Sequence, residues 1–192
     1  MRPLDRAPFY AQWRLPLLRS ILDDGRVVAC PAEGVWGLSC DPYNEAAVED
    51  LLTLKLRSVQ KGLIVVAADA VMFDPVLSYL SPDERQRLSA SWPGPNTWLV
   101  PNHGVFPDWI TGGSTDVAIR VTSALALKRL SESFGGPLVS TSANPAGLPP
   151  PHHLWALRRY FGVTLPALPG MLEEAGKSST IRRIGDGTIV RP

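Results

Sequence analysis

The chain has 192 residues, 45% of them apolar, and its 19 Lys and Arg residues nearly balance its 18 Asp and Glu residues. A chain of this size can bury about 70% of its unfolded surface in one core, so we expect a single domain over residues 1–192. The net charge of +1 argues against wholesale electrostatic binding of nucleic acid, and any basic site has to be local.

The sequence predicts neither a structural zinc site nor a membrane association. The two cysteines, Cys30 and Cys40, and the three histidines match no metal-binding pattern. The N-terminus lacks the hydrophobic core of a signal peptide, and the apolar runs are too short to span a membrane. We therefore expect a cytoplasmic protein with free thiols.

Apolar periodicity, capping residues and turn residues divide the chain into helices and strands. In chain order the sequence predicts a helix at 7–24, a strand at 26–30, a helix from 44 to 55, a strand at 63–68, helices at 69–80 and 82–91, strands at 96–100 and 117–121, a helix at 123–134, a segment at 138–144 that begins as a strand, a short helix at 153–160 and a hairpin of 179–184 with 188–191. The spacing is irregular. The pattern fits an α/β fold with a single mixed, twisted sheet flanked by helices better than a strict βαβ repeat.

Four positions refine these elements. Pro16 either kinks the first helix or marks its true beginning. Pro31 ends or edges the first strand, and the glycine-containing loop 31–38 follows at that strand's C-terminal end, where open α/β sheets bind ligands. Asn44 and Ser81 are candidate N-caps for the helices that follow them.

The segment 55–63, which we call the basic loop, carries Lys55, Arg57 and Lys61 without an acid and leads into an apolar strand. Cations at a strand edge suit a polyanion such as a nucleoside triphosphate, because the Coulomb energy is large where water is partly excluded. Alternatively, Lys55 and Arg57 stabilise the negative end of the preceding helix. These residues alone leave both interpretations open. A joint contact of Lys55 and Arg57 with one ligand requires that the helix has ended there.

The segment 140–144, which we call the hydroxyl-rich segment, is a candidate phosphate cradle. The chain contains no P-loop, no Gly-x-Gly-x-x-Gly and no Gly-x-Ser-x-Gly motif, so a nucleotide would need another cradle. Ser140, Thr141, Ser142 and Asn144 supply three hydroxyls and an amide beside closely spaced backbone N–H groups. The alternative is an ordinary strand-to-loop turn in which these side chains bind their own backbone.

Lys55-x-Arg57, followed far downstream by Ser142-x-Asn144, resembles the Lys-x-Arg and Ser-x-Asn signature of the YrdC-like family, the threonylcarbamoyl-AMP synthases. Further segments similar to the family run in family order over about residues 20–192, at 31–41, 61–63, 92–97, 117–120, 137–147, 179–181 and 191–192. The resemblance is to the short, single-domain bacterial form.

The resemblance implies a YrdC-like fold and an ATP-dependent activity. Such proteins make L-threonylcarbamoyladenylate from L-threonine, bicarbonate and ATP and release pyrophosphate, with Mg²⁺ on the phosphates. A partner tRNA-threonylcarbamoyl transferase complex then modifies adenosine 37 of tRNAs. Weak binding of tRNA by the chain itself stays open.

The resemblance also implies roles for individual residues, and fixed cations and donors suit a reaction that builds negative charge on phosphate oxygens. It makes Lys55, Arg57, Ser142 and Asn144 the catalytic set. It assigns ATP to Arg57, Lys61, Thr97, Ser142, Asn144 and Arg191, and L-threonine to Ala32, Ser140 and Arg120. From the residues alone, Arg120 could instead pair with Asp116 or another acid, and Arg191 could be a solvated terminus.

Ala32 departs from the family, which usually has threonine at this position. A lost hydroxyl contact costs about 0.5–1.5 kcal/mol of binding if nothing replaces it, so strict selectivity for threonine stays open. Two other functions stay open as well. One is an RNA-binding module without catalysis, which the near-neutral charge disfavours. The other is a paralogue that makes a different carbamoyl adenylate.

Overall fold

The computed structural model describes residues 11–172 and 179–192. Its strands are β1 Val28–Pro31, β2 Trp36–Ser39, β3 Ile64–Ala67, β4 Asn96–Pro101, β5 Asp116–Val121, β6 Leu138–Ser142, β7 Thr180–Arg183 and β8 Ile189–Arg191. Its helices are α1 Leu15–Asp23, α2 Glu45–Lys55, α3 Asp74–Leu77, α4 Pro82–Ser89, α5 Asp108–Thr111, α6 Leu125–Phe134 and α7 Leu154–Phe161, with short 3₁₀ turns at Gln12–Arg14, Val59–Lys61 and Ala70–Phe73.

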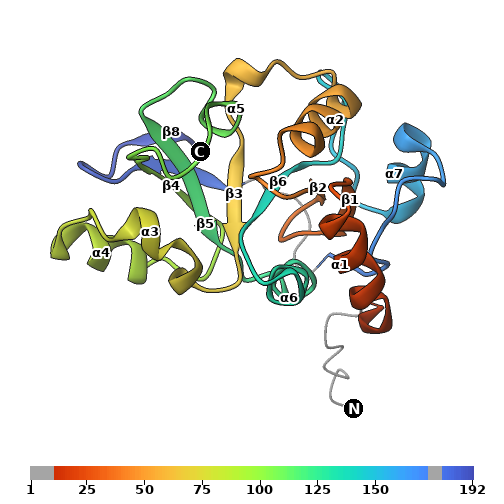
Figure 1. Cartoon of the computed structure of the whole chain (residues 1–192), viewed down its shortest axis with the longest axis horizontal. Helices are drawn as coiled ribbons and strands as arrows, with labels where there is room; N and C mark the ends of the chain where they lie inside the picture. The colour runs from red at the N-terminus through yellow and green to blue at the C-terminus, as the bar shows by residue number, and fades with distance from the viewer. Residues whose placement is uncertain (1–10, 173–178) are drawn as a thin grey trace, which may run out of the picture.

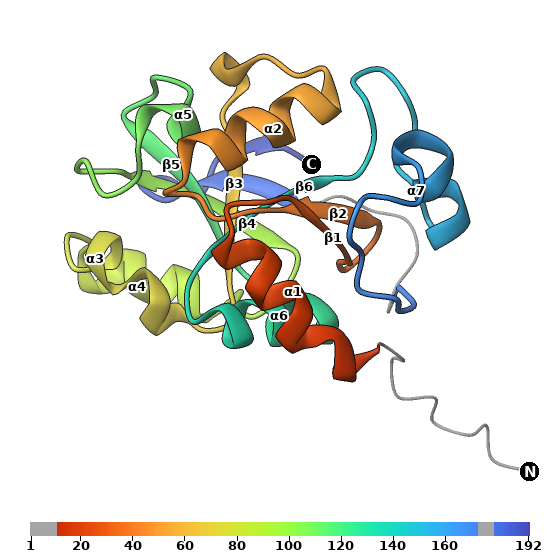
Figure 2. The same ribbon diagram turned by 45° about the vertical axis from the view of Figure 1, so that its right-hand side comes forward.

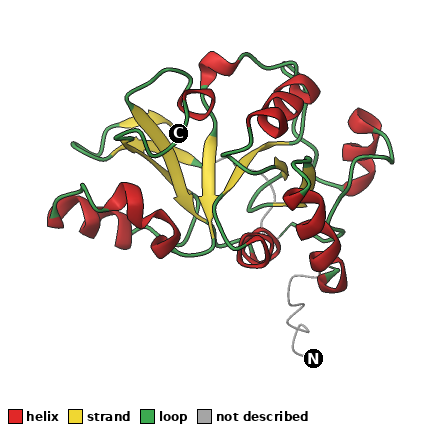
Figure 3. Ribbon diagram, viewed as in Figure 1, coloured by secondary structure: helices red, strands yellow, loops and turns green. Residues whose placement is uncertain are grey.

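The strands of the described residues join one eight-stranded sheet in the order β1-β2-β6-β3-β5-β4-β7-β8. The pairs β3–β5 and β4–β7 are parallel, and the other neighbours are antiparallel. The sheet runs through the middle of the molecule with helices around it (Figures 1 and 3). This confirms the predicted mixed, twisted sheet flanked by helices.

Alternate residues of the central strands enter two separate hydrophobic cores, one on each face of the sheet. On β3, Val65 and Ala67 belong to the larger core, whose helical side chains include those of α2 and α7. Val66 belongs to the smaller core, which α1 and α6 cover. Figures 1 and 2 show α1 and α6 packed side by side below the sheet. On β6, Leu138 lies in this smaller core while Ser140 and Ser142, on the same face by the period of two, line a cavity.

Several predicted boundaries are confirmed by capping contacts. Pro16 lies in the first turn of α1 and so marks its beginning; residues 7–10 of the predicted helix lie outside the described residues. The side chain of Asn44 accepts a hydrogen bond from the N–H of Ala47 (3.1 Å), and Ser81 forms a capping box with Glu84 at the start of α4.

Two predicted elements were wrong. The helix expected at 69–80 breaks into a 3₁₀ turn and the one-turn α3, with Pro75 in its first turn. The loop expected at 31–38 contains the strand β2. Within β2, a Cβ at Gly37 would lie 3.3 Å from the carbonyl oxygen of Thr141, so glycine here permits the close approach of β2 to β6.

The basic loop begins where α2 ends. Leu56 adopts a left-handed backbone conformation (φ 50°), and the N–H of Arg57 bonds back to the carbonyl of Leu52 (3.0 Å), as in a Schellman cap. The helix has therefore ended before Arg57, as a shared ligand contact required.

Cys30 and Cys40 are buried free thiols, and burial raises the pKa of both. Free thiols are as predicted. Within residues 11–172 and 179–192, we find no helix with the length and apolar character needed to cross a membrane.

Candidate functional site

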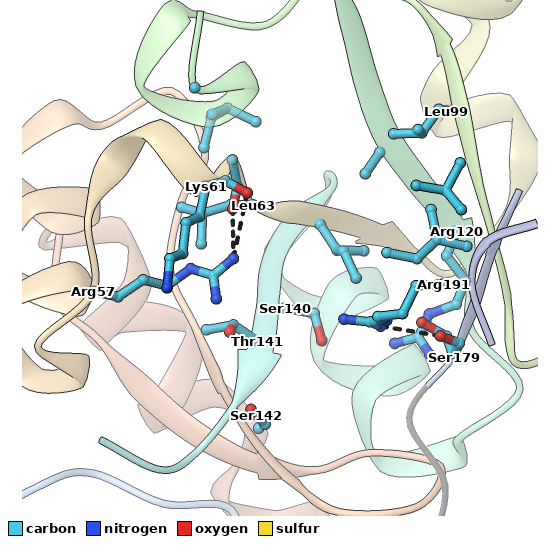
Figure 4. Close-up of a pocket in the computed structure, with 18 of the residues that line it drawn as sticks. Arg57, Lys61, Leu63, Leu99, Arg120, Ser140, Thr141, Ser142, Ser179 and Arg191 are labelled. Atoms are coloured by element: carbon cyan, nitrogen blue, oxygen red, sulfur yellow. Dashed lines mark hydrogen bonds between the residues drawn. The ribbon is translucent and has the colours of Figure 1, made fainter. Parts of the chain in front are cut away.

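A cavity of about 440 Å³ opens on the same face of the sheet as α1 and α6, over the part of it that these helices leave uncovered. Its walls come from distant parts of the chain: the loop between β1 and β2, the basic loop, the end of α5, and single or several residues of strands β2 to β8. Figure 4 shows Arg57 and Lys61 on one side, Arg120 and Arg191 on the other, and the hydroxyl-rich segment of β6 between them.

Among the described residues, four cations line this cavity against two carboxylates, those of Glu33 and Asp116. Burial lowers the pKa of Arg57 and of Arg191, and the pKa of Arg191 is lowered further by the nearby charges of Arg57 and Arg120. The cations on the two sides thus repel one another across the cavity. An anion placed between them would relieve this repulsion.

Arg57 is held by its own loop. Its guanidinium donates to the carbonyl oxygens of Gly62 (3.0 Å) and Lys61 (3.4 Å), while its buried Nε has no protein partner. Glycine at 62 is needed here, because its φ is +59° and a Cβ would lie 3.1 Å from the carbonyl oxygen of Thr111. The basic loop is therefore packed tightly against the end of α5.

Arg120, on β5, forms a buried ion pair with Glu33 from the β1–β2 loop (3.1 Å). This bears out the alternative that Arg120 pairs with an acid, although the acid is Glu33 and not Asp116. Glu33 also accepts from Thr122 Oγ1 (2.6 Å) and from the N–H of Ser123 (3.3 Å). The pair leaves Arg120 Nε buried without a protein partner, and Arg120 is one of the residues that line the cavity.

Arg191 comes from the last strand and donates to the carbonyl oxygen of Ser179 (3.0 Å). Ser179 in turn accepts a hydrogen bond through its side chain from Thr97 Oγ1 (2.8 Å). Arg191 and Ser179 line the cavity, whereas Thr97 is fully buried behind Ser179. Arg191 is thus an exposed cation that lines the cavity and is tied to the chain by its bond to Ser179.

The structure brings most of the sequence-predicted site residues together. Those that line the cavity are Ala32, Arg57, Lys61, Arg120, Ser140, Ser142 and Arg191. Three others do not line it: Lys55, Thr97 and Asn144. Lys55 is only 4% exposed and donates to the carbonyl oxygens of Ser142 and Asn144. The Asn144 amide donates to the carbonyls of Pro145 and Leu148.

The sequence pattern gave no role to several residues of the cavity wall. Ser179 stands within a segment similar to the family, which was the available signal. The end of α5, with Thr111 and Gly112, carried none. A Cβ at Gly112 would lie 2.7 Å from the nitrogen of Gly62, and this contact between distant segments becomes visible only in the fold.

The carboxylates near the cavity are not arranged as a metal site. In the part of the chain that the structure describes, no three His, Cys, Asp or Glu side chains gather as metal ligands. Glu33 is engaged by Arg120, Thr122 and Ser123, and Asp116 lies 3.9 Å from Arg183. A divalent cation here would have to be held mainly by the ligand's own oxygens.

A mixed α/β sheet that presents four cations and a row of hydroxyls to one cavity has the charge and shape that suit a small polyanion. The chain belongs to the Sua5/YciO/YrdC family, whose model, described as "Telomere recombination", matches residues 20–192.

Named relatives cover nearly the whole chain. A threonylcarbamoyl-AMP synthase of Cellvibrio japonicus is 47% identical over 180 residues, which is 93% of this chain and 95% of that protein. A protein of the same name from Stutzerimonas stutzeri is 46% identical over 181 residues, 94% of this chain and 97% of that protein.

Solved structures share the fold. The crystal structure of P. abyssi Sua5 complexed with L-threonine has a TM-score of 0.85 and 26% identity, and it covers 94% of this chain. The match spans 54% of the Sua5 chain, so this chain corresponds to about half of that protein. E. coli YciO, with a TM-score of 0.79 and 17% identity, covers 94% of this chain and 89% of its own, and shows the fold alone.

Proposed function

We propose that this chain is an ATP-dependent threonylcarbamoyl-AMP synthase. As a nucleotidyltransferase it joins L-threonine, bicarbonate and ATP into L-threonylcarbamoyladenylate and releases pyrophosphate. The observation that carries the proposal is the cavity, in which cations and hydroxyls from distant segments surround one space of about 440 Å³, a size typical of small-molecule sites. The name shared by relatives of 46–47% identity supports the particular reaction.

The nucleotide half of the site lies along the basic loop and the end of β6. Attack of a threonyl carbamate on the α-phosphate moves negative charge onto equatorial oxygens and onto the departing pyrophosphate. Arg57 and Lys61 supply fixed positive charge on one side and Arg191 on the other, and Ser142 supplies a neutral donor between them. Such donors lower the barrier because they already face the position where charge develops.

The amino-acid half of the site is formed by Ala32, Ser140 and Arg120. All three line the cavity, and Ser140 and Arg120 are almost fully buried. The guanidinium charge of Arg120 in the cavity wall suits the carboxylate of an amino acid. The presence of L-threonine in the related Sua5 structure supports this assignment.

Mg²⁺ is part of the proposal as the ion that accompanies ATP. The ion would be held mainly by phosphate oxygens, since the nearby carboxylates of Glu33 and Asp116 are engaged by arginines. When bound, it neutralises charge on the phosphates. The chain's own contribution is to hold the triphosphate between Arg57, Lys61 and Arg191.

The product implies a later step and a place in the cell. A threonylcarbamoyl adenylate is an activated acyl group, and we propose that a tRNA-threonylcarbamoyl transferase complex carries it to adenosine 37 of tRNA. We further propose that the chain acts in the cytoplasm, where ATP and tRNA are available, and that it works as one domain.

An omission assay tests the function. Pyrophosphate release is measured with ATP, Mg²⁺, bicarbonate and L-threonine, and then with each component left out in turn. We expect release only with the complete set, and we expect L-threonylcarbamoyladenylate as the product by mass spectrometry.

Two outcomes of this assay would overturn the proposal. Release that ignores L-threonine but depends on another amino acid would identify a paralogue that makes a different carbamoyl adenylate. No release, together with salt-sensitive binding of RNA, would identify a binding module without catalysis.

A further inference from the structure

Lys55 is the one cation of the Lys-x-Arg motif whose side chain turns away from the cavity. Its ammonium group donates to the carbonyl oxygens of Ser142 and Asn144, the latter at 3.0 Å. Its own carbonyl accepts from the N–H of Ala146 (2.7 Å). Lys55 is therefore bonded through both its side chain and its backbone to the loop that begins at Ser142.

The burial of Lys55 leaves it little access to a ligand. It is 4% exposed and does not line the cavity, whereas Arg57 and Lys61 both do. An ammonium group has three donor hydrogens, and two of them are directed at the carbonyls of Ser142 and Asn144. Hydrogen bonds from a charged donor in a buried environment are about twice as strong as neutral ones.

The loop after β6 needs such an anchor because it leaves the sheet at this point. The pairing of β2 with β6 ends at Gly37 and Ser142, and one further backbone bond runs from the N–H of Ala143 to Trp36 (2.7 Å). Beyond it, the carbonyl of Asn144 has no strand partner and is bonded by the Lys55 ammonium. The anchor fixes the direction in which Ser142 leaves the strand.

We propose that Lys55 is a positioning residue, which fixes the backbone of residues 142–146 so that Ser142 faces the cavity, and that it does not itself contact ATP. The inference rests on the proposed function for the identity of the ligand. It also gives a physical reason why a Lys-x-Arg segment and a Ser-x-Asn segment belong together: the first holds the second in place, and only Arg57 of the first pair reaches the cavity.

Amide hydrogen exchange without ligand tests the anchor directly. In Lys55→Met, which keeps the unbranched stem but removes the donors, we expect the N–H of Ala146 and its neighbours at 143–148 to exchange at least tenfold faster than in the wild type. Lys61→Met is the matched control, because it removes a cation of the same loop that lines the cavity. Its exchange at 143–148 should equal that of the wild type.

Steady-state kinetics distinguish a role of Lys55 in positioning Ser142 from a general loss of order in the whole site. In the pyrophosphate-release assay, Lys55→Met should raise the KM for MgATP at least tenfold and change the KM for L-threonine less than twofold, since Ser140 and Arg120 remain in β6 and β5. Lys55→Arg, which restores a charged donor, should recover part of the ATP affinity. If Lys55→Met does not fold, Lys55→Gln, which lacks the charge and the length of the lysine, replaces it in both measurements.

The outcomes distinguish this proposal from the proposed function. Unchanged exchange at 143–148 in Lys55→Met, with weaker ATP binding, would make Lys55 a direct ligand and overturn the positioning role while the function stands. Equal losses for ATP and L-threonine would also overturn it. If the wild type releases no pyrophosphate, the proposed function fails, and the assignment of an ATP-positioning role falls with it even if the exchange result holds.

Discussion

Arg57 combines an unused buried donor with a place in the cavity wall, which makes it the residue whose loss should weaken ATP binding most. Arg57→Ala should raise the Kd for MgATP by about 10- to 100-fold, because a hydrogen bond to a charged group contributes about 1.5–3 kcal/mol. Isothermal titration calorimetry measures this directly. Arg159→Ala, which removes an exposed arginine of α7 outside the cavity, is the control. Equal affinities for the two variants would contradict the site assignment.

Ala32 lines the cavity and is nearly buried, so a hydroxyl added there would point into a confined space. Ala32→Thr should lower the KM for L-threonine by about 2- to 10-fold, which corresponds to about 0.5–1.5 kcal/mol for one added hydrogen bond. Ala32→Val has the same shape without the hydroxyl and is the control. If both variants change the KM alike, the space near Ala32 and not a hydrogen bond determines selectivity.

Lys55 should make stability depend on pH. Burial first, and the charge of Arg57 second, lower its pKa from 10.5 to about 8. Between these two values the unfolded chain binds more protons than the folded one, so stability rises with pH by up to about 1.4 kcal/mol per unit. Below pH 8 Lys55 is charged in both the folded and the unfolded state, so it no longer makes the free energy of unfolding depend on pH.

The measurement compares the wild type with Lys55→Met by urea unfolding at several pH values between about 7 and 10. The free energy of unfolding of the wild type should grow relative to that of the variant as the pH rises above 8. A difference that stays constant over this range would show that the lysine titrates normally in the folded protein.

At the scale of single elements, the end of α2 carries local strain that a substitution can relieve. Leu56 is 75% exposed and holds a φ of 50°, a conformation that costs a residue with a Cβ about 1–2 kcal/mol. Leu56→Gly should therefore raise the free energy of unfolding by about 0.5–1 kcal/mol, since the unfolded chain gains some entropy in return. Leu56→Ala, which keeps the Cβ, should not. A glycine variant less stable than the alanine variant would contradict the interpretation.

Helix starts could be predicted from the sequence, whereas a strand that depends on pairing with distant segments could not. The caps at Asn44 and Ser81 depend on neighbours in sequence and were predicted. The start of α1 next to Pro16 was one of two alternatives that the sequence left open. The strand β2 was missed because a glycine in a short segment is typical of a loop, and only its pairing with β1 and β6 makes it a strand.

The same distinction holds within the site. The cationic and hydroxyl character of the cavity was predicted from residue types. The direction of the Lys55 side chain, towards the backbone of Ser142 and not into the cavity, was not predicted, since it depends on a carbonyl 87 residues away. The pairing of Arg120 with Glu33 likewise depends on a loop that lies far from β5 in the sequence.

On the scale of the whole molecule, the cavity is an assembly of segments that lie between Ala32 and Arg191 in the sequence. The strand β3 pairs with β5 and β6, and β4 pairs with β7. Contacts of such long range form slowly, because the loops between them must close first, whereas helices form within microseconds.

Refolding after dilution from urea should accordingly show two signals that do not coincide. Helical circular dichroism should recover first, and binding of a fluorescent ATP analogue should return later, when the distant strands have joined. The return of nucleotide binding would then report the time at which the final stage of folding is complete. Recovery of both signals at one rate would mean that the walls of the cavity assemble together with the first helices.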